Sequence, residues 1–104
     1  MRLSFHDDAM RELRLARNQV FVEGGVDAEV SFLLAMNSAL RIISSFPLRA
    51  PPAKGHAEVR QFRLDRLPRV RFPWRILYRV TETGSRILAI EHAADRPNTW
   101  LYRR

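Results

Sequence analysis

The sequence predicts an α+β fold in which a helical hairpin covers one face of an antiparallel sheet. Three observations lead to this prediction. Apolar residues recur at helical spacing through the first half of the chain, a proline-bearing linker follows at residues 47–55, and apolar and polar residues then alternate. A chain of 104 residues has room for one hydrophobic core, so we expect a single domain over residues 1–104.

A short strand and a first helix are expected at the start of the chain. Residues 2–5 alternate polar and apolar side chains, as a strand does. Asp7 or Asp8 can cap the helix that follows, because a carboxylate accepts hydrogen bonds from the free amides of a first turn. The apolar positions of this helix are Ala9, Leu13, Ala16 and Val20. We expect it to end at residues 23–25, where two glycines can take the positive φ of a helix terminus.

A second helix is predicted to begin near Asp27 and Glu29, whose charges suit a helix N-terminus. Its apolar stripe consists of Phe32, Met36, Ala39, Ile43 and Phe46. Pro47 should stop it, because proline cannot continue a helix. The two helices should therefore pack as an antiparallel hairpin.

The second half of the chain predicts a three-stranded antiparallel meander. Residues 47–55 carry Pro51 and Pro52 and should hold no regular structure. Strands are expected over residues 58–64, 72–80 and 86–92, with Gly84 in the turn before the last strand. The hairpin should cover one face of this sheet and leave the other face open. Trp74, Ile76 and Leu88 are expected to pack beneath the helical stripe.

Charge is unevenly distributed along the chain. The net charge is +7, and residues 1–52 contribute none of it, because six arginines there balance six acidic residues. The excess in residues 53–104 suggests a polyanionic partner, either nucleic acid or an acidic protein segment. The simpler alternative is a solvated surface of an arginine-rich protein.

Several function classes find no support in the sequence. The chain has no cysteine, so a disulfide scaffold or a cysteine zinc site is excluded and a cytoplasmic location is expected. No apolar stretch approaches the length of a membrane span. The three histidines are too scattered for a metal site, and no glycine-rich phosphate loop is present. We therefore predict neither a metal nor a cofactor.

Local motifs resemble those of the RelE/ParE family of toxins from type II toxin–antitoxin systems. The most specific is residues 72–80, Phe-Pro-Trp-Arg-Ile-Leu-Tyr-Arg-Val, which is similar to a family strand. Residues 59–62 resemble an earlier strand of the family, and residues 46–51 its linker. His92, Arg96, Pro97 and Trp100 match the family's C-terminal segment in kind and spacing. Ala94 and Asp95 replace a region that is usually basic, which weakens the expectation of a fully basic site.

The resemblance implies a toxin that a co-encoded antitoxin neutralises by direct binding. It leaves the target open between two classes. ParE-like members inhibit DNA gyrase, whereas RelE-like members cut mRNA in the ribosome. The linker and the strand at residues 72–80 favour the ParE-like reading. A non-toxic relic that only binds its antitoxin is a further alternative.

A RelE-like ribonuclease without a metal needs a proton acceptor, a proton donor and a cation against the phosphorane. Arg75 is the best candidate cation, because a guanidinium bonds phosphate bidentately, and Arg60 or Arg63 on the neighbouring strand could join it. His92 could act as an acid or base, and Tyr102 could do so with help from nearby cations. The structural alternatives are a hydrogen-bonded core histidine and arginines that only solvate the open face.

A second set of residues could contact the target or nucleic acid without catalysis. It comprises Arg63, Arg79, Arg96 and Trp100. Trp100 and Tyr102 could stack on bases, but packing of the C-terminal segment over the sheet is the expected role. Tyr78 shares the parity of Ile76 and is expected to be structural.

Overall fold

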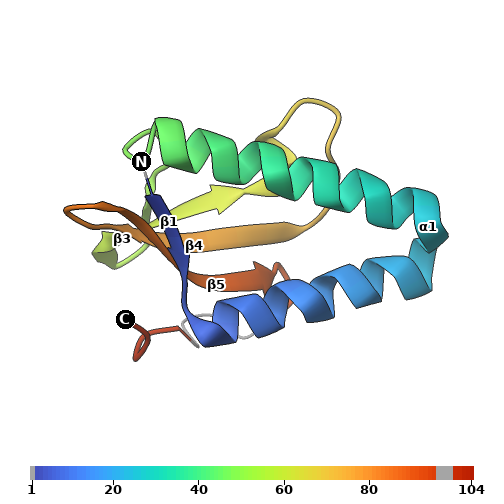
Figure 1. Cartoon of the computed structure of the whole chain (residues 1–104), viewed down its shortest axis with the longest axis horizontal. Helices are drawn as coiled ribbons and strands as arrows, with labels where there is room; N and C mark the ends of the chain where they lie inside the picture. The colour runs from blue at the N-terminus through green and yellow to red at the C-terminus, as the bar shows by residue number, and fades with distance from the viewer. Residues whose placement is uncertain (1, 96–99) are drawn as a thin grey trace.

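A computed structural model describes residues 2–95 and 100–104. A helical hairpin lies along one face of a five-stranded sheet (Figure 1). In chain order the elements are β1 (Arg2–Phe5), α1 (Asp7–Ser45), β2 (Pro52–Ala53), β3 (His56–Arg63), the 3₁₀ turn η1 (Leu64–Arg66), β4 (Trp74–Val80) and β5 (Gly84–His92). The predicted α+β class is confirmed.

The helix α1 is a hairpin of two segments broken at one glycine. Gly25 has φ 79° and ψ −168°, which interrupts the helix between residues 7–24 and 26–45. The predicted end of the first helix is confirmed, although the second segment follows without a loop. The expected N-cap is wrong by one position. His6 is the N-cap, because its Nδ1 accepts a hydrogen bond of 3.0 Å from the Asp8 amide, and both aspartates lie in the first turn.

The sheet is mixed, with strand order β1-β5-β4-β3-β2. Strands β3, β4 and β5 form the predicted antiparallel meander. Two edge strands extend it. β1 pairs in parallel with the first half of β5, and the two residues of β2 pair with β3. The prediction that residues 47–55 hold no regular structure is therefore wrong at β2, where the chain returns alongside β3.

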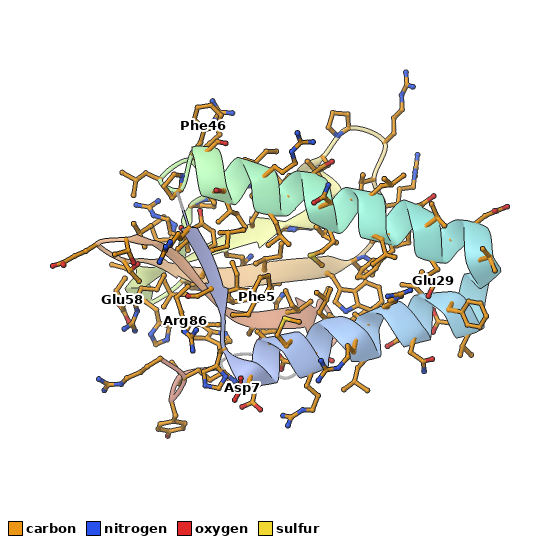
Figure 2. The ribbon with its side chains drawn as sticks, viewed as in Figure 1. Phe5, Asp7, Glu29, Phe46, Glu58 and Arg86 are labelled. Atoms are coloured by element: carbon orange, nitrogen blue, oxygen red, sulfur yellow. The ribbon has the colours of Figure 1, made fainter. Side chains whose placement is uncertain are left out.

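The main core lies between the helical hairpin and the sheet. Trp74, Ile76 and Tyr78 of β4 are buried on this face together with the predicted helical stripe. The ring of Phe32 meets that of Trp74 edge to face at a centroid distance of 5.5 Å. Phe46 is the exception in the stripe, because it is exposed at the end of α1 (Figure 2).

A β-bulge corrects the expected position of Leu88. Ile76 pairs with Ile90 and Leu77 with Ala89, but Tyr78 pairs with Ile87, so the pairing skips one residue of β5. The extra residue is Leu88, which turns to the opposite face of the sheet from the hairpin. That second face carries its own buried cluster, with Trp100 packed over it. The prediction that this face is open is therefore wrong. The cluster comprises Ala53, Val59, Leu77, Leu88, Ala89 and Trp100.

Gly84 has a different role from the predicted one. It begins β5 and pairs with Arg2 of β1 instead of lying in the turn. A Cβ at this position would lie 1.9 Å from the carbonyl oxygen of Arg2. Glycine is therefore needed for the close approach of β1 and β5.

Side chains close the edge of β5 beyond β1. The amide of Ile90 donates to Glu12 Oε1 at 3.1 Å, and the carbonyl of Leu88 accepts from Arg103 Nη1 at 3.0 Å. The amide of His92 donates to Asp95 Oδ2 at 2.7 Å. Backbone groups that a neighbouring strand would satisfy are thus satisfied by side chains, which protects the edge from pairing with another chain. In the part of the chain that the structure describes, no helix is long and apolar enough to cross a membrane.

Candidate functional site

Arg75 lies on the second face of the sheet, as predicted, but it is paired there. Its Nε donates to Oε1 of Glu91 at 2.9 Å, and the Glu91 side chain is only 3% exposed. The two residues are opposite each other in the β4–β5 register, so the meander itself creates the pair. The pairing occupies the Nε donor of Arg75 and offsets part of its charge, which lowers its ability to stabilise a phosphorane.

Arg63 is the neighbour that joins Arg75. The two are register partners on β3 and β4 and line one hollow of about 300 Å³. Arg63 also donates to Asp65 at 2.7 Å, so both arginines already have a carboxylate partner. A second hollow of about 340 Å³ lies on the other side of Arg75, between Gln61, Glu91 and Trp100.

Arg60 does not belong to this group. It precedes Gln61 on β3 and therefore points to the opposite face from Arg63. Its Nη1 donates to the carbonyls of Leu48 and Ala50, at 3.1 and 2.6 Å. Arg60 thus holds the linker against the sheet.

His92 has the environment of a structural histidine. Its ring meets that of Trp74 edge to face at 4.6 Å, and its Nδ1 accepts a hydrogen bond of 3.0 Å from the Ala94 amide. Tyr102 lies near the end of the chain and is 93% exposed. Arg75 and His92 lie at neighbouring positions of β4 and β5 but on opposite faces of the sheet. Arg60 lies at the linker and Tyr102 near the end of the chain, so the four predicted catalytic side chains do not form one group.

The predicted contact residues are also separated. Arg79 lines a further hollow of about 380 Å³ with Arg60 and Glu58. Trp100 is buried over the second face, and its ring lies 5.2 Å from that of His56. The packing role expected for Trp100 matches this position. Arg96 lies outside the described residues.

Sequence reasoning missed the ion pair that fastens the C-terminal segment. Arg103 donates from Nη1 to Glu12 Oε1 at 2.7 Å and from Nη2 to Oε2 at 3.0 Å. These bonds, with the charge of Glu12, raise the pKa of Arg103 above its ordinary value, although burial acts against the rise. No local pattern could reveal a pair 91 residues apart. Glu91, by contrast, could have been found by aligning the two predicted strands around their turn.

The described residues contain no cluster of three or more histidine, aspartate or glutamate side chains that could hold a metal ion. What the molecule presents instead is exposed apolar and cationic surface on a small, well-packed α+β domain. Large exposed apolar residues on the hairpin and linker include Leu15, Val22, Leu34, Phe46 and Leu48. Fold and surface together define a small basic α+β domain with exposed apolar and cationic side chains.

Comparison with known proteins identifies the family. The family model described as the ParE toxin of the type II toxin–antitoxin system parDE matches residues 3–97. The chain therefore belongs to the ParE toxin family. No curated protein sequence matches it. Among solved structures it is similar to a chain of the chromosomal ParDE toxin–antitoxin system from P. aeruginosa, at 18% identity and a TM-score of 0.71, over 88% of this chain and 95% of that one. At this identity the structural likeness shows the fold alone.

Proposed function

We propose that this ParE-family toxin inhibits DNA gyrase by binding, and that a co-encoded antitoxin neutralises it in the cytoplasm. The observation that carries the proposal is the pairing of Arg75 with the buried Glu91. Arg75 is the best candidate for the catalytic cation, and its Nε is already bonded to a carboxylate within the fold. An inhibitor that acts by binding needs no free catalytic cation.

The positions of the other candidates support the same choice. Arg60 donates to the linker carbonyls, His92 packs against Trp74, and Tyr102 is exposed. A ribonuclease would require its acid, base and cation around one phosphate. The RelE-like mRNA endonuclease remains the second candidate, favoured only by the shared hollow of Arg63 and Arg75.

Two assays separate these functions. We expect the purified chain to inhibit supercoiling by gyrase and to leave mRNA intact in a translating extract. Codon-dependent mRNA cleavage with unaffected gyrase would contradict the proposal. Silence in both assays would contradict it as well and point to a relic that only binds its antitoxin.

A double variant sharpens the comparison. Changing Arg75→Gln together with Glu91→Gln removes both charges without leaving one of them buried and unpaired. A ribonuclease that depends on Arg75 should lose about a hundredfold or more in cleavage. A binder should lose only about 1 to 3 kcal/mol of affinity for gyrase, unless Arg75 is a central anchor. Circular dichroism of the double variant checks that it folds.

The antitoxin is proposed to bind as an acidic, amphipathic segment that orders on contact. A hollow of about 370 Å³ suits such a segment, because apolar Ile42, Phe62 and Leu67 share its lining with cationic side chains. Those cations are Arg49, Arg63 and Arg66. Co-expression with the neighbouring gene should restore growth and give a complex that survives moderate salt. Failure of the two proteins to associate would contradict this part of the proposal.

A further inference from the structure

The connection between β3 and β4 concentrates positive charge. Residues 63–72 contain four arginines and one aspartate, which gives a net charge of +3. The single acidic side chain, Asp65, is already engaged by Arg63 at 2.7 Å. Three arginine side chains are exposed and form no hydrogen bond or ion pair within residues 2–95 and 100–104, namely those of Arg66, Arg69 and Arg71. Three charges are therefore available to a partner.

These arginines are held in place by the apolar residues between them. Leu64 is fully buried, and Leu67, Val70 and Phe72 pack against the main core. Two turns fold the segment, because the Leu67 amide donates to Leu64 O at 3.0 Å and the Val70 amide to Leu67 O at 3.2 Å. The connection rises past the second helical segment at the top of Figure 1. Apolar anchors facing inward thus present the cations outward from a fixed backbone.

Arg69 gives an independent sign that the charge matters. It is the only non-glycine residue with positive φ among the described residues, at 64°. Glycine or asparagine would take this conformation at lower cost, and such strained positions cluster at functional sites. An arginine at this position is consistent with a requirement for its side chain.

We propose that residues 63–72 form an arginine loop that contacts the phosphate backbone of duplex DNA through Arg66, Arg69 and Arg71. The outward side chains of the loop are cationic, whereas Leu64, Leu67, Val70 and Phe72 are turned toward the core. Arg69 and Arg71 do not line the apolar hollow that the antitoxin is proposed to fill, and a polyphosphate backbone needs only charge. The proposed contact is independent of base sequence, because hydrogen bonds to phosphate oxygens carry no sequence information. The proposal does not depend on gyrase inhibition, although it would place this protein against the DNA that gyrase holds.

Fluorescence anisotropy with a labelled duplex of about 20 base pairs, between about 50 and 200 mM salt, tests the loop directly. The logarithm of the DNA-binding constant falls with the logarithm of the salt concentration, and each phosphate contact contributes about 0.9 to the steepness of that fall. The triple variant R66A/R69A/R71A should therefore reduce the steepness by about 2.7. The matched control R2A/R14A/R104A removes the same charge from exposed arginines elsewhere and should change the slope much less. The triple lysine variant of the loop should keep the slope, because phosphate contacts require charge more than geometry.

Two results would overturn the proposal. One is an equal loss in the loop variant and the control, which would mean that only net charge matters. The other is unchanged DNA affinity in the loop variant together with a weakened antitoxin complex, which would assign the loop to a protein partner. Thermal melts confirm that each variant folds. Because gyrase is absent from the assay, failure here leaves gyrase inhibition standing, and failure of gyrase inhibition leaves a positive DNA result standing.

Discussion

Tyr78 lies in the core, bonds the linker through its hydroxyl and is acted on by the charge of Arg60. It is fully buried, and its hydroxyl donates to the carbonyl of Pro47 at 2.5 Å. Burial raises the pKa of Tyr78 above its ordinary value of 10.0, while the charge of Arg60 and a backbone hydrogen bond act in the opposite direction. The neutral phenol is thus the form that the folded protein holds.

The variant Tyr78→Phe should cost about 1 kcal/mol near neutral pH, the usual worth of one hydrogen bond. It should also change the dependence on alkaline pH. With a folded pKa above 10.0, the unfolded chain releases a proton that the folded chain keeps, so wild-type stability falls as pH rises above that value. Tyr78→Phe should lack this part of the fall. Urea unfolding at about pH 9 and 11 measures the difference, and parallel curves for the two proteins would contradict the assignment.

Both faces of strand β4 are buried, but a different part of the chain covers each face. Ile76 faces the helical hairpin, whereas Leu77 faces the cluster beneath Trp100. The bulge of β5 opposite Tyr78 allows Leu88 to join Leu77, so the sheet has two apolar faces over its centre. The strand therefore contributes buried side chains to both apolar clusters.

Ile76→Ala should therefore destabilise the protein by about 2 to 4 kcal/mol, through lost burial and the cavity left behind. Leu15→Ala is the matched control, because Leu15 is 61% exposed on α1 and its truncation should change stability by less than about 0.5 kcal/mol. Denaturant melts compare the two variants. A loss below about 1 kcal/mol for Ile76→Ala would show that the core is not packed as described.

Gly84→Ala tests the junction of β1 with β5. The added Cβ would meet the Arg2 carbonyl at 1.9 Å, so the strands must separate. We expect a substantial loss of stability and faster hydrogen exchange of the β1 amides. Gly55→Ala is the control, since Gly55 has φ 79° and open space around it, and should show strain without a clash. Equal effects at both positions would contradict the close-approach explanation.

At the scale of the whole molecule, the C-terminal residues are bonded to the first helical segment and to β5. Arg103 reaches Glu12 on α1 and the Leu88 carbonyl on β5, while Trp100 lies across the second face. Arg86 also bonds the carbonyls of Phe5 and Arg104, at 3.1 and 3.3 Å, close to the start of α1 (Figure 2). The C-terminal segment thus depends on the first helix for its position.

Arg103→Ala should lower stability by about 1 to 3 kcal/mol, because it removes hydrogen bonds to a partly buried carboxylate. It should also loosen the segment that holds Trp100, which acrylamide quenching of tryptophan fluorescence would detect. Arg104→Ala should do neither, since within the described residues its side chain has no partner. Unchanged quenching in the Arg103 variant would show that Trp100 is held by its own packing alone.

The sequence by itself determined the helical hairpin, the meander, the core side of Ile76 and Tyr78, and the resemblance to ParE-type toxins. These depend on local periodicity, on the glycines near residue 25 and on short motifs, all of which are visible along the chain. It also placed Arg75 on the face away from the helices, because side chains alternate along a strand.

Only the tertiary structure decided what Arg75 contacts there. The pairing with Glu91 follows from strand register, and the position of Leu88 follows from a bulge within that register. The parallel pairing of β1 with β5 and the bond between Glu12 and Arg103 join residues about 80 to 90 positions apart, as set by how the layers pack. Local propensity carries no information on such contacts, so the sequence predicted the elements and their chemistry, and packing determined which charges remain available to a partner.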